Sequence, residues 1–192
     1  MSLNILLMND EMIKDRTSIH GNIDPKLIYP DIKVAQDMYI LPVIGTALYN
    51  KLQTAVNAND WTGLTNYKLL LDNYILDALM YYTLAELPFT MGYQFWNKGI
   101  VRKQGENTDL PSMSELVDIS NRNKDKGQWY ANRLRLYLID KAVTLYPEYL
   151  QPGNTIDTVI PDQKGFAIGV YLGDDKNNPY CNQGGFTSKP YT

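Results

Sequence analysis

The stretch TGLTNYKLLLDNYILDALMYYTLAEL, residues 62–87, decides the fold expected of this chain. Apolar side chains recur in it at spacings of three and four residues, which predicts an α-helix. The apolar face consists of Leu64, Leu70, Leu71, Tyr74, Ile75, Ala78, Leu79, Tyr82, Leu84 and Ala85. A helix that is apolar over so much of its surface belongs in a core. Pro88 is expected to end this helix, because proline has no N–H to donate to the preceding turn.

Two shorter amphipathic helices are expected before the core helix. Asp24 and Pro25 predict a helix start, because aspartate is a good N-cap and proline is tolerated at the first helical position. This helix is expected to run to Ile40 and to be broken by residues 41–42. The apolar spacing then resumes and predicts a second helix that ends at residues 57–60.

A long helix is expected in the second half of the chain, from about Met113 to residue 146. Its start is marked by Ser112 and Glu115, which fit a capping box. Its second half carries a clear apolar stripe, formed by Tyr130, Leu134, Leu138, Ala142 and Leu145. Residues 118–128 are polar on all sides, so they form either a solvated segment or a surface that touches a partner.

After Pro152 the apolar period changes from about 3.6 residues to two. Apolar residues alternate with others along residues 166–172, and residues 155–160 form a second β-rich run. Together they predict a β-hairpin with a five-residue loop. The residues that follow, 173–192, are rich in Gly, Asn, Pro and Asp, with aromatic side chains spaced through them.

The predicted fold class is therefore mainly α, a helical bundle with an extended C-terminal arm that contains a β-hairpin. Residues 1–23 are expected to form an N-terminal arm and residues 24–150 the bundle. A loop or hairpin is expected at residues 89–111, and residues 151–192 form the C-terminal arm.

The C-terminal arm is the part of the sequence that points to binding. An isolated two-stranded hairpin is marginal in water, because it buries too little surface to offset the backbone entropy it loses. The hairpin therefore docks either on its own helical domain or on another chain. The residues expected to contact a partner are Ile156, Ile160, Phe166, Ile168, Val170, Tyr171, Leu172, Tyr180, Phe186 and Tyr191.

Composition argues against several classes of function. The 192 residues carry a net charge of −3, which disfavours a protein that binds many phosphates of a nucleic acid. A single cysteine and a single histidine leave no disulfide and no zinc cluster, so no metal or other cofactor is expected. The longest apolar runs are too short to span a membrane, and no secretory leader is recognisable, which predicts synthesis in a cytoplasm.

Common catalytic motifs are missing from the sequence, including the phosphate-binding loop and the nucleophile elbow. His20 has no obvious nucleophile beside it, and Cys181 has no basic flank that would lower its pKa. We therefore expect no enzyme. The first alternative is a small-molecule or carbohydrate-binding module of a bacterial protein, built on Tyr93, Phe95 and Trp96. The second is a hydrolase built on carboxylates such as Glu86, Glu106 or Glu115.

The helix order includes a distinctive link, YILPVIG at residues 39–45, followed by LYNKL at residues 48–52. With the long core helix and the non-helical C-terminal arm, it resembles the head-to-tail connector (portal adaptor) proteins of tailed bacteriophages. It is most similar to those of phages and prophages of Bacteroides-type bacteria (crAss-like phages). The resemblance covers roughly residues 24–146.

The resemblance implies a ring of subunits, usually twelve, that lies beneath the portal protein and joins it to the tail components. DNA would pass through the lumen of this homo-oligomer without specific binding. The arm would reach onto an adjacent ring component. The protein would be made in the cytoplasm of the bacterial host and would reside at the head-to-tail interface of the virion.

Overall fold

A computed structural model describes residues 5–96, 99–102, 111–153 and 157–162 of the chain. The predicted strand at residues 166–172 lies outside this part, as do all the predicted partner-binding residues except Ile160. The predicted turn-rich tail, residues 173–192, and the alternative carboxylate Glu106 also lie outside it.

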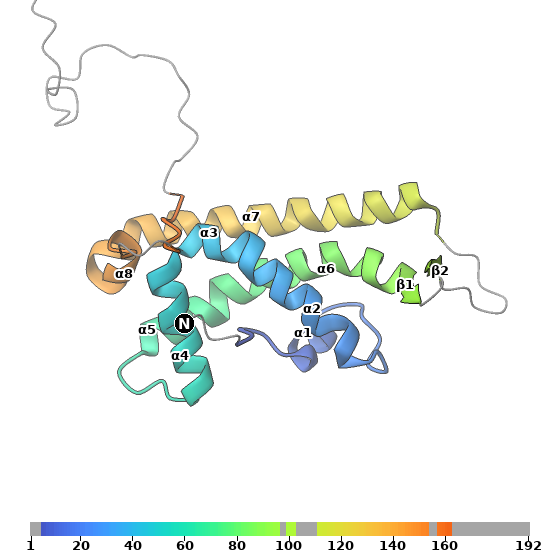
Figure 1. Ribbon diagram of the computed structural model, residues 1–192. Coiled ribbons are helices and arrows are strands. Elements are labelled where there is room, and N and C mark those ends of the chain that lie inside the picture. The colour runs from blue at the N-terminus through green and yellow to red at the C-terminus, as the bar shows by residue number, and fades with distance from the viewer. Residues whose placement is uncertain (1–4, 97–98, 103–110, 154–156, 163–192) are drawn as a thin grey trace, which may run out of the picture.

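Two long helices form the centre of the molecule. Helix α6 (Leu76–Gly92) and helix α7 (Met113–Leu145) run side by side and make the most extensive contact of any pair of elements (Figure 1). The predicted capping box at the start of α7 is confirmed. The Ser112 hydroxyl accepts from the Glu115 N–H at 3.3 Å, and the Glu115 carboxylate accepts from the Ser112 N–H at 2.6 Å.

The remaining elements wrap around one end and one side of this pair, and the prediction of a mainly helical bundle is confirmed (Figure 1). In chain order they are α1 (Asp10–Arg16), α2 (Pro25–Ala35), the π-helical turn η1 (Gln36–Ile40), α3 (Leu41–Ile44), α4 (Thr46–Ala58), α5 (Thr65–Leu70), the π-helical turn η2 (Leu71–Ile75) and, after α7, α8 (Pro147–Leu150). Within the described residues, no helix is both long enough and apolar enough to cross a membrane.

The predicted break at residues 41–42 is wrong, because α2, η1 and α3 form one continuous helical run that ends at Gly45. The reason is the wider turn of η1. Here the Leu41 N–H bonds to the carbonyl of Gln36, five residues back. Pro42 directly follows this wider turn, so the helical run passes through the proline although Pro42 has no N–H to donate to the preceding turn.

The predicted end of the core helix at Pro88 is also wrong, because α6 continues through this proline to Gly92. Pro88 cannot donate to the carbonyl of Leu84 one turn earlier. The side-chain amide of Asn123 on α7 donates to that carbonyl instead, at 3.4 Å. The core helix begins at Thr65, three residues later than predicted, and its apolar residues are buried or half-buried as expected.

The region between α6 and α7 contains the expected hairpin. Strands β1 (Tyr93–Trp96) and β2 (Gly99–Arg102) pair antiparallel, with Phe95 opposite Ile100. The hairpin extends the end of the molecule at which α6 finishes and α7 begins (Figure 1).

The N-terminal region is more ordered than the predicted arm. Asn9 caps α1 by accepting from the Met12 N–H at 2.9 Å, and Asp10 pairs with Lys14 at 2.9 Å. Before α1, the chain is held by the buried side chain of Gln36. Its amide oxygen accepts from the Leu7 N–H at 2.8 Å, and its amide nitrogen donates to the carbonyl of Ile5 at 2.9 Å. The interpretation of residues 1–23 as one extended arm is therefore corrected.

Candidate functional site

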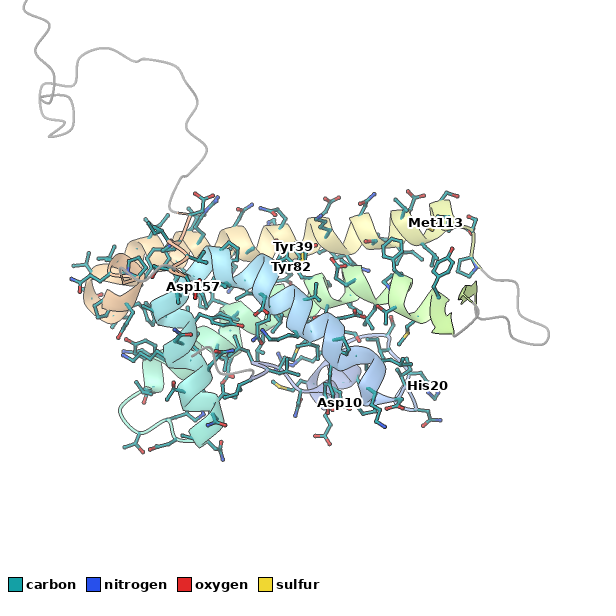
Figure 2. The ribbon with its side chains drawn as sticks, in the orientation of Figure 1. Asp10, His20, Tyr39, Tyr82, Met113 and Asp157 are labelled. Atoms are coloured by element: carbon teal, nitrogen blue, oxygen red, sulfur yellow. The ribbon has the colours of Figure 1, made fainter. Side chains whose placement is uncertain are left out.

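The first residues of the C-terminal arm are fixed to the turn between α3 and α4. We call residues 157–162 the arm root. The Thr46 N–H donates to the carbonyl of Val159 at 3.1 Å, and the Val159 N–H donates to the Thr46 hydroxyl at 2.8 Å. The Asp162 N–H donates to the carbonyl of Pro42 at 3.0 Å. Figure 2 shows Asp157 beside this turn.

Gly45 makes this attachment possible. Its φ angle of +77° lies in the left-handed region, and a Cβ there would lie 2.7 Å from Cδ of Pro161. Because Gly45 has no side chain, it cannot cap α4, and the carbonyl of Val159 accepts from the first N–H of that helix instead. The arm root thus completes the N-terminus of α4.

Ile160 is the predicted partner-binding residue that the structure describes. It lies in the arm root between the anchored Val159 and Pro161, and 72 % of its surface is exposed. A single exposed isoleucine is ordinary on a protein surface, so the contact of Ile160 with a partner stays a prediction.

Stacked tyrosines hold the inner face of α7 against the core helix. Tyr74 stacks on Tyr137 with a centroid distance of 4.2 Å, and Tyr81 stacks on Tyr130 at 5.3 Å. Tyr74 and Tyr81 are seven residues apart on one helix, and Tyr130 and Tyr137 are seven residues apart on the antiparallel one. This is the spacing at which side chains return to one face of a packed helix.

Cations from α7 cover several of these rings. Arg133 lies 4.7 Å from the centroid of Tyr74, and Lys126 lies 5.3 Å from that of Tyr81. Lys124 lies 5.5 Å from the ring of Tyr39. Such contacts satisfy part of the positive charge of α7 within the molecule.

Tyr39 joins the α2 side of the molecule to the helix pair. Its ring stacks on Tyr82 at 4.3 Å, and its hydroxyl donates to the Glu86 carboxylate at 2.6 Å (Figure 2). Burial and this carboxylate raise the pKa of Tyr39 to about 12, so the hydroxyl remains a donor at neutral pH. Gly127 lets α7 approach here, because a Cβ at that position would lie 2.8 Å from the Tyr82 ring.

The mostly polar residues 118–128 lie in the first half of α7, and most of them face solvent. Asn123 compensates Pro88, while Lys124 and Lys126 cover rings. These contacts within the chain favour the solvated-helix interpretation over a partner surface for this segment.

The second half of α7 carries an apolar surface that the sequence analysis did not identify. We call Trp129, Leu136, Ile139 and Val143 the outer stripe. Trp129 is 62 % exposed, Leu136 63 % and Val143 80 %. These three residues are seven apart, so they line one face of the helix, opposite the buried Leu134 and Leu138. The same spacing was visible in the sequence.

The carboxylates of the alternative hydrolase are engaged elsewhere. Glu115 belongs to the capping box, and Glu86 accepts from Tyr39.

Asp31 is a buried carboxylate at the contact of α2 with α6. Burial raises the pKa of Asp31, and the nearby charge of Glu86 raises it further. The hydrogen bond from Thr90 lowers this pKa, but the net shift is upward. The described residues contain no group of three or more His, Cys, Asp or Glu placed to hold a metal ion.

The alternative aromatic binding site lies at the hairpin. The Tyr93 hydroxyl is 3.6 Å from Sδ of Met113, at the start of α7, and the side chains of Phe95 and Trp96 lie outside the described part.

A pocket of about 450 Å³ lies elsewhere, between the segment before α1 and helices α4 and α5, and is lined by Leu7, Met12 and Trp61 among others. His20 lies exposed in the turn before α2, where its Nδ1 accepts from the Asn22 N–H at 3.2 Å.

Comparison with known proteins gives one match. The model of a family described as "Family of unknown function (DUF6712)" matches residues 40–159, which is more than half of the chain. No curated protein and no solved structure matches the chain. The matched span begins just before the turn at Gly45 and ends at Val159, which bonds to that turn.

Proposed function

Because this chain belongs to DUF6712, a family of unknown function, we propose a function from its own surfaces: it is a structural virion protein. In this proposal it is a subunit of the head-to-tail connector (portal adaptor) ring that joins the portal to the tail of a crAss-like phage. The ring is a homo-oligomer, with twelve subunits as in the proteins that the sequence resembles.

The observation that carries the proposal is the anchored arm root. Three hydrogen bonds fix residues 157–162 to residues 42–46, so the chain is held against the bundle as far as Asp162. A tail attached through a flexible linker would adopt many conformations and would lose that conformational entropy on binding. An anchored root reduces that cost and sets the direction from which the arm approaches a neighbour.

The helical body supports the same role. The pair of α6 and α7 gives a stiff element, since 33 residues of α7 span roughly 50 Å at 1.5 Å per residue. The stacked tyrosines and their cations hold this pair in one register. A ring that carries mechanical load between head and tail needs such rigid subunits.

We propose that the arm docks on a neighbouring ring component through the strand predicted at residues 166–172, because the arm root, which contains most of the other predicted strand, is bonded to its own bundle. Docking would cover apolar residues that such a strand leaves in water. The portal protein and the tail components are the other proposed partners. The net charge of −3 suits a channel through which DNA slides, because such a wall should not grip phosphates.

The direct test is electron microscopy of the purified full chain, alone and with the portal protein of the same phage. We expect closed rings, and twelve subunits in each ring when the portal is present. A chain that stays monomeric at micromolar concentration with and without the portal would contradict the proposal. A saturable small ligand bound by the monomer would support the binding-module alternative instead.

A further inference from the structure

Three polar side chains fasten α8 to the bundle, and none of them belongs to the surfaces described above. The Lys51 ammonium on α4 donates to the Tyr67 hydroxyl on α5 at 2.9 Å, and that hydroxyl donates to the Glu148 carboxylate on α8 at 2.7 Å. Lys51 also forms an ion pair with Glu148, and its ammonium lies 4.1 Å from the centroid of the Tyr67 ring. We call these three residues the clasp.

The clasp is a network and not a single exposed ion pair. Water screens an exposed pair, whereas a charged network contributes more to stability. The side chains of Lys51 and Glu148 are 33 % and 25 % exposed. Burial alone would raise the pKa of Glu148, but the hydrogen bonds from Lys51 and Tyr67 outweigh burial and lower this pKa. Burial alone would lower the pKa of Lys51, and the hydrogen bonds to Glu148 and Tyr67 raise it. Both groups are therefore charged at neutral pH.

The neighbouring aromatic residues give the clasp its importance for α8. Tyr149 is fully buried, yet its hydroxyl has no hydrogen-bond partner among the described residues. A polar group buried without a partner costs free energy, which offsets part of the gain from burying the ring. Tyr146, which precedes α8, packs edge-on against the clasp residue Tyr67, with a centroid distance of 5.3 Å. Glu148 thus supplies the polar contact with the bundle that Tyr149 lacks.

The clasp and the arm root are attached to the same helix. Helix α8 packs against α4 (Figure 1), and Lys51 lies five residues after Thr46, about 7.5 Å along α4 at 1.5 Å per residue. The chain from Glu148 to Val159 is therefore fixed to α4 at both ends. Two attachments of one segment strengthen each other, because the first raises the effective concentration of the second. Loss of the clasp would lengthen the free chain before the arm root and weaken its attachment.

We infer that Glu148 is a positioning residue of the arm, because its clasp with Lys51 and Tyr67 keeps the arm root bonded to residues 42–46. The part that this residue plays in assembly rests on the proposed function, in which the arm joins subunits. The effect of the clasp on the arm root does not depend on that function and can be measured separately.

Hydrogen exchange at the arm root tests the inference. The amides of Val159 and Asp162 donate to Thr46 and Pro42, so their exchange reports whether the root is attached. Mass spectrometry follows it on the full chain, diluted until sedimentation shows a monomer. In E148A these amides should exchange roughly tenfold faster, the factor expected for the loss of a charge-assisted hydrogen bond. The amides of α6 and α7 should keep their rates. An unchanged rate at the arm root, or an equal rise in α6 and α7, would overturn the inference.

A similar network in α1 provides the matched control. Asp10 accepts from the Lys14 ammonium at 2.9 Å and from the Tyr29 hydroxyl at 2.9 Å, so it has the chemistry of the clasp without contact to α8. D10A should leave exchange at the arm root unchanged. A rise in D10A as large as that in E148A would show that the root responds to any loss of stability, which contradicts a specific role for Glu148.

Exchanging the two charges separates ion pairing from packing. In K51E/E148K the Tyr67 hydroxyl can still donate to a carboxylate and accept from an ammonium. Exchange at the arm root should return to the rate of the unchanged chain. Rates as high as those of E148A would contradict an ionic clasp.

The same variants test the role of Glu148 in assembly by electron microscopy of concentrated samples. Fewer rings are expected for E148A than for the unchanged chain, and the number should recover in K51E/E148K. Unchanged ring formation by E148A, despite faster exchange at its arm root, would overturn the positioning role. If the unchanged chain forms no rings, the proposed function fails, while the exchange measurements still decide whether the clasp holds the arm root.

Discussion

The two halves of α7 pack against the same core helix, yet they present different surfaces outward. Most of residues 118–128 face solvent with polar side chains, several of which make contacts within the chain, and Ile119 is the exposed apolar residue among them. Residues 129–143 face outward with the outer stripe. Both halves pack their inner face against the core helix, and we call this contact the inner seam. Because the inner seam runs along both halves, folding alone does not account for the apolar outer face of the second half. That difference separates residues that build the bundle from residues available to a partner.

The inner seam can be broken at Gly127, where the largest loss of stability is expected. A side chain at this position meets the Tyr82 ring, so G127L should lower the free energy of unfolding by about 3 kcal/mol. Urea denaturation followed by circular dichroism measures it. D125L on the exposed face of the same helix is the control and should change stability by less than about 0.5 kcal/mol. Equal losses in the two variants would contradict a shared inner seam.

The attachment of the arm root can be broken at Gly45. G45A places a Cβ against Pro161 and forces an unfavourable φ angle, with an expected loss of about 2 kcal/mol. G63A is a matched control, because Gly63 has a φ angle of +73° but no atom within 4 Å of an added Cβ. The excess loss in G45A over G63A should disappear in a chain that ends at Gly153. If the excess persists there, contact with the arm root is not its cause.

The polar half of α7 is expected to contribute to stability at one amide. N123A removes the donor to the Leu84 carbonyl beneath Pro88 and should cost about 1 kcal/mol. N121A, two residues earlier on the exposed side, should cost almost nothing. Thermal unfolding of N123A and N121A measures this difference. Equal melting temperatures of the two variants would show that the hydrogen bond from Asn123 to the Leu84 carbonyl does not stabilise the helix at Pro88.

The outer stripe should matter least for folding. L136D/V143D changes two exposed side chains, so the free energy of unfolding of the monomeric protein should move by less than about 0.5 kcal/mol. A larger loss in a monomeric sample would show that the stripe supports the bundle, and the contrast between the two halves of α7 would fail.

Much of the helical body could be predicted from spacing and caps. The apolar residues of the core helix, the start at Asp24 and the capping box at Ser112 are local signals, and the structure confirms them. The Asn9 cap of α1 and the seven-residue spacing of Trp129, Leu136 and Val143 are also local.

The errors occur where distant residues decide the outcome. Pro88 is tolerated because Asn123, thirty-five residues later, replaces the missing donor, which no local pattern reveals. The arm root bonds to Thr46 across more than one hundred residues, so the N-terminus of α4 depends on a segment that propensity assigns to a separate arm. The π-helical turn η1 before Pro42 also depends on how the helix packs, and the local spacing of residues does not predict it.

The most direct test of the anchored arm compares two truncations of the chain, one ending at Asp162 and one ending at Gly153, by molar mass and urea denaturation. We expect the chain ending at Asp162 to be a monomer with the stability of the unassembled full chain. The chain ending at Gly153 should also be a monomer, but less stable by about 2 kcal/mol, because α4 and Pro42 lose their hydrogen-bond partners. Equal stability of the two truncations, or assembly of either into rings, would contradict an arm whose root belongs to the bundle and whose remainder joins subunits.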